Sequence, residues 1–159
     1  MDKKKGILVV SFGTSHPVTR AATIEAIEDS ISKAFADIKV YRAWTSKMII
    51  SKIQKNTMEK IPTVNEALSQ MAADGITDVQ PTHVINGIEN DIMKADALKF
   101  RDSFDSISFG VPLLSSTQDM EELVHIIIEA FPSLGNDEVL ILMGHGSEHY
   151  ANMAYAALD

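Results

Sequence analysis

The sequence predicts an α/β fold, an open parallel sheet flanked by helices on both faces. Short apolar runs alternate with longer segments of helical period, which is the pattern of successive βαβ units. The chain has 159 residues, of which 45% are hydrophobic. A chain of about 150 residues buries roughly two thirds of its unfolded surface, which is enough for one core. We therefore expect residues 1–159 to form a single α/β domain.

The expected elements follow one another in βα order. Residues 7–12 form the first strand, and Pro17 suits the first turn of the helix after it. Thr63 and Glu66 have the spacing of a capping box at the start of a helix over residues 63–73. Pro81 lacks an N–H, so the third strand is expected at an edge of the sheet or as an irregular segment. The other expected elements are strands at 38–43, 78–85, 106–111 and 139–142, and helices from about 45, within 88–104, at 118–131 and at 148–158.

Composition excludes several classes of function. The chain has no cysteine, which rules out disulfides, thiolate nucleophiles and thiolate metal sites. Its net charge is −8, from 14 Lys and Arg against 22 Asp and Glu, so nucleic acid is not an expected partner. No segment approaches the roughly 18 apolar residues of a membrane span, and the amino terminus lacks the cleavage pattern of a signal peptide. We expect a cytoplasmic protein without a membrane partner.

The pentapeptide Met143-Gly144-His145-Gly146-Ser147 follows the apolar residues 139–142 and places a histidine at the exit of a predicted strand. Open parallel sheets bind ligands outside the carboxyl ends of their strands, and an imidazole between two glycines is not covered by neighbouring side chains. Neutral imidazole accepts a proton or ligates a divalent metal near neutral pH. His145 is therefore a candidate base, metal ligand or both. The alternative is a loop histidine that caps the helix beginning near Ser147.

The exits of the other predicted strands also carry polar residues and glycines, and in a parallel sheet these exits share one rim. Such residues also fill turns and cap helices in any protein, and we assign more than half of them to that role. His125 lies among apolar residues of a predicted helix and is expected to pack in the interior. The candidates for ligand contacts are Ser11, Phe12, Gly13, Thr14, His83, Asn86, Gly87, Leu114, Ser115, Gly144 and Gly146.

Familiar cofactor motifs do not fit this sequence. Gly144-His145-Gly146 begins like a dinucleotide fingerprint, but His149 occupies the position of the third glycine. His145 and His149 have the spacing of a helical zinc pair, yet the glutamate pattern of zinc proteases is missing between them. Neither a P-loop nor a nucleophile elbow is present. No organic cofactor is expected.

Several segments, spread over the whole sequence, combine into a more specific pattern: Leu8-Val9-Val10-Ser11-Phe12-Gly13-Thr14-Ser15, Arg42-Ala43-Trp44-Thr45-Ser46-Lys47-Met48-Ile49-Ile50, His83-Val84-Ile85-Asn86-Gly87, Gly110-Val111-Pro112-Leu113-Leu114-Ser115-Ser116, Met143-Gly144-His145-Gly146 and Ala154-Tyr155-Ala156-Ala157-Leu158-Asp159. Each is weak alone. In this order they resemble the class II tetrapyrrole chelatases, and within them the anaerobic sirohydrochlorin cobaltochelatases of the cobalamin pathway.

The resemblance implies a chelatase-like fold in which two similar α/β halves face each other across a cleft that holds the macrocycle. This chain corresponds to the amino-terminal half. His145 matches the family histidine that binds the incoming Co²⁺ and is assigned to proton abstraction from a pyrrole nitrogen. The implied substrates are Co²⁺ and sirohydrochlorin or a related tetrapyrrole. Imidazole suits cobalt, iron and nickel alike, so His145 does not choose the metal.

The family's further metal-binding glutamate and histidine belong to the carboxyl-terminal half, outside residues 1–159. The implied partner is therefore the missing carboxyl-terminal half, which we favour, or a second identical chain, as in a short homodimeric chelatase that uses another divalent metal. Arg20, Arg42 and Lys47 are candidate donors to the acid side chains of sirohydrochlorin. A non-catalytic tetrapyrrole or metal carrier and an unrelated α/β binding module are the other interpretations.

Overall fold

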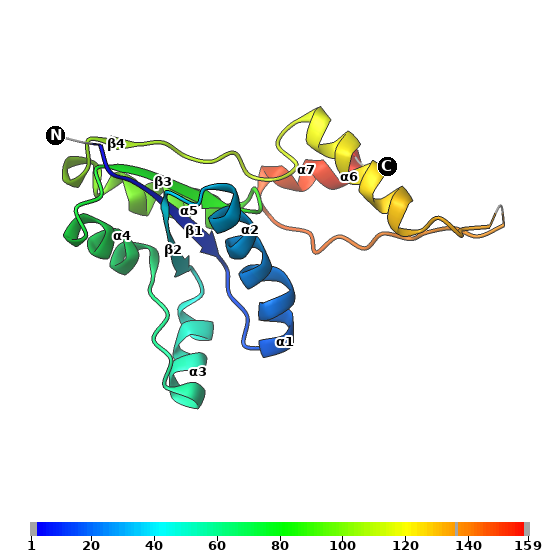
Figure 1. Cartoon of the computed structure of the whole chain (residues 1–159). Coiled ribbons are helices and arrows are strands. Elements are labelled where there is room, and N and C mark those ends of the chain that lie inside the picture. The colour runs from blue at the N-terminus through cyan, green and yellow to red at the C-terminus, as the bar shows by residue number, and fades with distance from the viewer. Residues whose placement is uncertain (1–2, 136, 158–159) are drawn as a thin grey trace.

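A computed structural model describes residues 3–135 and 137–157 (Figure 1). Within these residues the sheet contains four parallel strands in the order β2-β1-β3-β4. The strands are β1 (Lys5–Ser11), β2 (Lys39–Trp44), β3 (Asp78–His83) and β4 (Ser106–Ile107). The chain passes from β1 to β2 on one side and then crosses to β3 on the other. The strand order therefore reverses between β1 and β3, which is where open α/β sheets form their ligand crevice.

Helices cover both faces of the sheet, as predicted. Successive residues of a strand point to opposite faces. Tyr41 and Ala43 belong to the core cluster that includes Leu68, whereas Arg42 between them reaches Glu28. The elements around the sheet are α1 (Pro17–Arg20), the π-helical turn η1 (Ala21–Glu25), α2 (Ala26–Ala34), α3 (Lys47–Thr57), α4 (Val64–Ala73), α5 (Ile88–Leu98) and the short 3-10 turn η2 (Arg101–Ser103). Since Glu28 lies on α2 and Leu68 on α4, these two helices cover opposite faces.

The larger core lies between the sheet and the helices α4 and α5. Leu8, Leu68, Met71 and Met93 are fully buried there. Burying one such side chain stabilises the fold by roughly 1.5–3 kcal/mol, so this layer holds the strands in register. A smaller cluster on the other face contains Ile24, Trp44, Ile53 and Ile61. Through this cluster, η1 and α3 pack against the end of β2.

The capping box predicted at Thr63 is confirmed. The Thr63 N–H donates to Glu66 Oε2 at 2.9 Å, and the Glu66 N–H donates to Thr63 Oγ1 at 3.4 Å. Ser46 is the N-cap of α3, where its hydroxyl accepts from the N–H of Ile49. A second capping box joins Ser116 and Asp119 at the start of α6 (Thr117–Ala130). These side chains satisfy N–H groups that have no partner inside the helix.

Pro81 lies in an interior strand, which corrects the edge position expected from its missing N–H. The N and C=O groups of one residue in a strand face the same neighbouring strand. The Pro81 carbonyl accepts from the N–H of Gly110, at 3.0 Å, on the β4 side. The missing donor therefore faces β4, where ladder pairing covers only Ser106–Ile107 instead of the predicted 106–111. The backbone hydrogen bonds between β3 and β1 come from the residues that alternate with Pro81, so its missing N–H does not affect them.

The fifth strand predicted at 139–142 is wrong for this structure. These residues have no strand partner among the described residues, and Val139 and Ile141 are strongly exposed. In Figure 1 the chain runs out beyond α6 and returns through this orange segment to the 3-10 turn η3 (Tyr150–Asn152) and α7 (Met153–Ala157). A strand needs a neighbour to pair its backbone groups, and β4 does not supply one. The helix predicted from 148 is confirmed in its last part by η3 and α7.

Helix α6 contains no buried residue. His125 is accordingly exposed, and the expectation that it packs in the interior is wrong. The apolar neighbours of His125 predicted a core position, but no layer of the described chain covers this helix. Among residues 3–135 and 137–157, no helix is both long and apolar enough to cross a membrane.

Candidate functional site

The segments that follow β1 and β2 are joined at the carboxyl-terminal rim of the sheet. The N–H groups of Thr45 and Ser46 donate to the carbonyls of Ser11 and Phe12, at 3.0 and 3.2 Å. Ser11 is the last residue of β1, and the Phe12 side chain beyond it is half exposed. The rim therefore presents the aromatic ring of Phe12 on a backbone that is hydrogen-bonded to the segment after β2.

Gly13 is required by its close approach to the buried ring of Trp44. Its φ is +98°, in the region that favours glycine, and a Cβ placed on it would lie 2.5 Å from Trp44 Cε3. The guanidinium of Arg20 also lies over the indole ring, 5.2 Å from its centroid. The loop carrying Gly13 and Thr14 is thus seated directly on a rigid side chain of the smaller core cluster.

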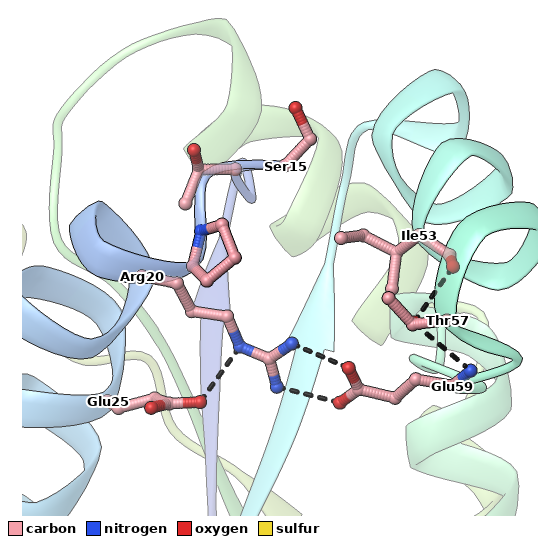
Figure 2. Close-up of a pocket in the computed structure, with 8 residues that line it drawn as sticks. Ser15, Arg20, Glu25, Ile53, Thr57 and Glu59 are labelled. Atoms are coloured by element: carbon pink, nitrogen blue, oxygen red, sulfur yellow. Dashed lines mark hydrogen bonds and ion pairs between the residues drawn. The ribbon is translucent and has the colours of Figure 1, made fainter.

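A pocket of about 350 Å³ opens beside this loop (Figure 2). Arg20 donates to both carboxylate oxygens of Glu59 at 2.7 Å, and its Nε lies 2.8 Å from Glu25 Oε1. The hydrogen bonds from Arg20 hold the pKa of the Glu59 carboxyl below its ordinary value. The lining residues are Thr14, Ser15, Pro17, Arg20, Glu25, Ile53, Thr57 and Glu59.

Two of the cations expected to receive acid side chains of a substrate are already paired. Arg20 is engaged by Glu59 and Glu25, and Arg42 donates through Nε and Nη2 to the carboxylate of Glu28. These ion pairs tie the first helical segment to β2 and to the end of α3. Both arginines therefore have a structural role in this arrangement. Lys52 is the cation that reaches the rim, with its Nζ 3.1 Å from Ser15 Oγ.

His83 ends β3 with its ring buried, at 5% exposure. Nδ1 lies 2.9 Å from the Ile85 carbonyl oxygen and 3.3 Å from the Ile85 nitrogen, while Nε2 has no hydrogen-bond partner among the described residues. Burial disfavours the imidazolium and lowers the pKa of His83. His83 is therefore a neutral imidazole at neutral pH, with one ring nitrogen not engaged.

The residues after β3 and before α6 lie against one another. The Leu113 N–H donates to the Val84 carbonyl at 2.8 Å. Leu114 has a φ of +59°, and Ser115 uses its hydroxyl on the Pro112 carbonyl and its N–H on Asp119. Ser115 therefore has a turn role in this structure. Asn86 and Gly87 lie between β3 and α5, and Gly87 is the N-cap residue of α5.

The loop that carries His145 is packed on η3 and α7 instead of leaving a strand. A Cβ on Gly144 would lie 2.6 Å from the Tyr155 ring, Gly146 has a φ of +72°, and the Ser147 N–H donates to Asn152 Oδ1 at 2.9 Å. His145 itself is exposed. Its accessibility agrees with the prediction, but the sheet does not supply its position.

The His145 loop reaches the rim through His149. His149 Nε2 lies 3.1 Å from Asp91 Oδ2, and Asp91 is in the first turn of α5, where its N–H donates to the Gly87 carbonyl at 3.2 Å. The structure thus connects residues 144–149 with the end of β3. Sequence reasoning missed Asp91, because no local signal pairs two residues that are 58 positions apart.

The described residues contain no group of three or more His, Cys, Asp or Glu side chains that could hold a metal ion. An exposed neutral imidazole supplies one metal ligand or accepts one proton. His145 can therefore take part in a metal site, and further ligands must come from elsewhere. The chemistry available on this chain is ligand exchange or proton transfer at one nitrogen beside a rim of backbone and hydroxyl groups.

The fold defines an open α/β protein whose strand order reverses between β1 and β3. Comparison with protein-family models matches residues 5–159 to the family described as Cobalt chelatase (CbiK). The chain belongs to this family.

Two curated relatives extend the comparison. The chain is 40% identical over 158 residues to a sirohydrochlorin cobaltochelatase of Salmonella typhimurium, covering 98% of this chain and 60% of the relative. It is 31% identical over 160 residues to the sirohydrochlorin cobaltochelatase CbiKC of Nitratidesulfovibrio vulgaris, covering 98% of this chain and 56% of that relative. The chain therefore spans somewhat more than half the length of these relatives.

Proposed function

We propose that the protein carrying this chain inserts Co²⁺ into sirohydrochlorin, and that this chain forms one side of the cleft. Family membership and the two relatives named for this activity support the proposal. The structural observation that carries it is the exposed imidazole of His145, between two glycines and connected to the end of β3. A planar macrocycle needs an open rim of this kind, with a metal ligand at its border.

His145 is proposed as both metal ligand and proton acceptor. Insertion of a divalent metal removes two N–H protons from the macrocycle while the metal ion gives up bound water. A neutral imidazole can ligate the entering ion or accept a pyrrole proton. One imidazole does not complete a coordination sphere, so the proposed reaction needs ligands from outside the described residues.

The macrocycle is proposed to contact the segments that flank the strand-order reversal. Ser11 ends β1 and is followed by Phe12, Gly13 and Thr14, and open sheets bind ligands at such a reversal. The unengaged Nε2 of His83 favours a polar contact at the end of β3. The other proposed contacts are Asn86, Gly87, Leu114, Ser115, Gly144 and Gly146.

The second side of the cleft is proposed to be a carboxyl-terminal half of a longer polypeptide. The shares of 60% and 56% of the relatives support this arrangement. So do the strongly exposed Val139, Ile141 and Met143, which have the apolar character of a buried strand. A second identical chain would cover the same residues, and the solution mass of the full-length protein distinguishes the two.

The test is the rate of sirohydrochlorin metallation, followed by absorbance, in the full-length protein. His145→Ala is expected to lose about 100-fold or more in rate, the range of one general acid or base. His125→Ala is the matched control, because His125 is also exposed but lies on α6. Unchanged rates in His145→Ala would contradict the role of His145. Binding of the macrocycle without acceleration would favour a carrier, and the same assay with Fe²⁺ and Ni²⁺ identifies the preferred metal.

A further inference from the structure

His149 forms a defined hydrogen bond with Asp91. The Ala151 N–H donates to His149 Nδ1 at 3.1 Å, so the ring proton lies on Nε2, which faces Asp91 Oδ2 at 3.1 Å. The His149 side chain is 8% exposed, and its ring centroid lies 4.1 Å from that of Tyr150. The ring is therefore fixed in orientation, tautomer and position.

The loop that carries His145 is hydrogen-bonded to the segment that carries His149. The His149 N–H donates to Ser147 Oγ, and the Ser147 N–H donates to Asn152 Oδ1, each at 2.9 Å. Gly144 is in close contact with Tyr155. Residues 144–157 thus form one small unit, in which His145 lies between two anchored positions.

The Asp91 contact connects this unit with the sheet. Within residues 3–135 and 137–157, no other hydrogen bond or ion pair joins residues 144–157 to residues 3–115. The segment between α6 and η3 has no regular secondary structure among its described residues, so the covalent connection fixes the unit only loosely. Among the described residues, the Asp91–His149 pair is therefore the polar contact that fixes the position of His145 relative to the rim.

We propose that Asp91 is a positioning residue for His145, holding the His145 loop at the rim through His149. This inference rests on the proposed function, since it assigns to Asp91 a role in the same reaction. Displacement of a reacting group by about 1 Å can cost on the order of 100-fold in rate. Loss of the contact is therefore expected to slow metallation through the displacement of His145.

The experiment combines two measurements on the full-length protein and its variants. Hydrogen–deuterium exchange of peptides covering 144–152 reports anchoring, and metallation kinetics report the consequence. Asp91→Ala and His149→Ala are expected to accelerate exchange in these peptides alone and to lower kcat by about 10- to 100-fold. The double variant is expected to be no worse than either single one, because both remove the same contact.

Two further variants separate positioning from general damage. Asp91→Asn retains an acceptor oxygen for His149 and is expected to restore most of kcat. Asp96→Ala removes a carboxylate farther along α5, which pairs with Lys99, and is expected to leave exchange at 144–152 and kcat unchanged. Unchanged exchange in Asp91→Ala would overturn the anchor. Faster exchange with wild-type kcat would overturn the positioning role.

The failure of the proposed function has a different signature. If the full-length wild-type protein does not accelerate cobalt insertion, the proposed function fails. Exchange at 144–152 then tests only whether Asp91 anchors the His145 loop. Equal exchange in Asp91→Ala and wild type would overturn this anchor.

Discussion

His83 and His145 lie in opposite environments, and the difference decides how each can meet a substrate. The His83 ring is buried at the end of β3, with its Nδ1 beside the backbone of Ile85. His145 is exposed in a loop of the unit 144–157. A buried imidazole is kept neutral by its surroundings, whereas an exposed one exchanges protons and ligands with solvent. His83 is therefore suited to a fixed polar contact, whereas His145 is accessible for its proposed role as a metal ligand.

The burial of His83 predicts a pH dependence of stability. Burial lowers the pKa of His83 in the folded chain below the ordinary value of about 6.5 that applies after unfolding. Between these two values the unfolded chain binds a proton that the folded chain does not. The free energy of unfolding should therefore fall as pH decreases from about 7.5 through 6.5 toward the lower pKa of the folded state.

Urea unfolding at several pH values between about 5 and 7.5 measures this effect. His83→Asn retains a polar atom near the Ile85 backbone and removes the titration, so the dependence on pH should become shallower. His125→Asn, which removes an exposed histidine, should retain the wild-type dependence. Equal slopes for wild type and His83→Asn would contradict the assignment to His83.

Among the elements, those set by local signals were predictable from sequence. The capping box of Thr63 and Glu66 begins α4 as expected, because both groups lie within one helical turn. The interior position of β3 was not predictable. It depends on the direction in which the missing N–H of Pro81 points, and that direction follows from register with β4. A sequence does not state the register of distant segments.

The candidate site also has features that the sequence predicts and features that depend on tertiary structure. The exposure of His145 was predictable from its two glycine neighbours. The residues 139–142 before it have the composition of a strand, but strand formation also requires a neighbour, and the described chain provides none. The contact between Asp91 and His149 depends on tertiary structure and has no local signature.

Thr63→Ala is expected to lower the free energy of unfolding by about 1 kcal/mol, within a range of about 0.5–2 kcal/mol. The substitution leaves the N–H of Glu66 at the start of α4 without its side-chain acceptor, and α4 contributes Leu68 and Met71 to the core. Urea unfolding is the measurement. Ser69→Ala is the control, since the Ser69 hydroxyl is exposed and only donates to the Asn65 carbonyl within the helix. A similar loss in both variants would argue against the cap.

At the scale of the whole molecule, the described chain has two unlike parts. Residues 3–115 form the sheet and its buried cores. By contrast, α6, η3 and α7 contain no buried residue, and the apolar side chains near them are exposed. Exposed apolar side chains in this number favour association with another chain or with another part of the protein. The 159-residue chain should therefore associate with itself when that other part is missing.

Ile141→Asp in the 159-residue chain is expected to reduce this self-association, measured by sedimentation velocity over a range of concentrations. Ile141 is 84% exposed in the segment without a strand partner, and a charge there opposes burial against a second chain. Val18→Asp is the matched control, because Val18 is 83% exposed on α1 and belongs to the sheet part of the molecule. Far-UV circular dichroism should be unchanged in both variants.

In the full-length protein, Ile141→Asp should lower the thermal unfolding midpoint, since the proposed carboxyl-terminal half then buries this side chain. A monomeric wild-type chain at high concentration, or equal effects of the two substitutions, would show that residues 139–143 are not the associating surface.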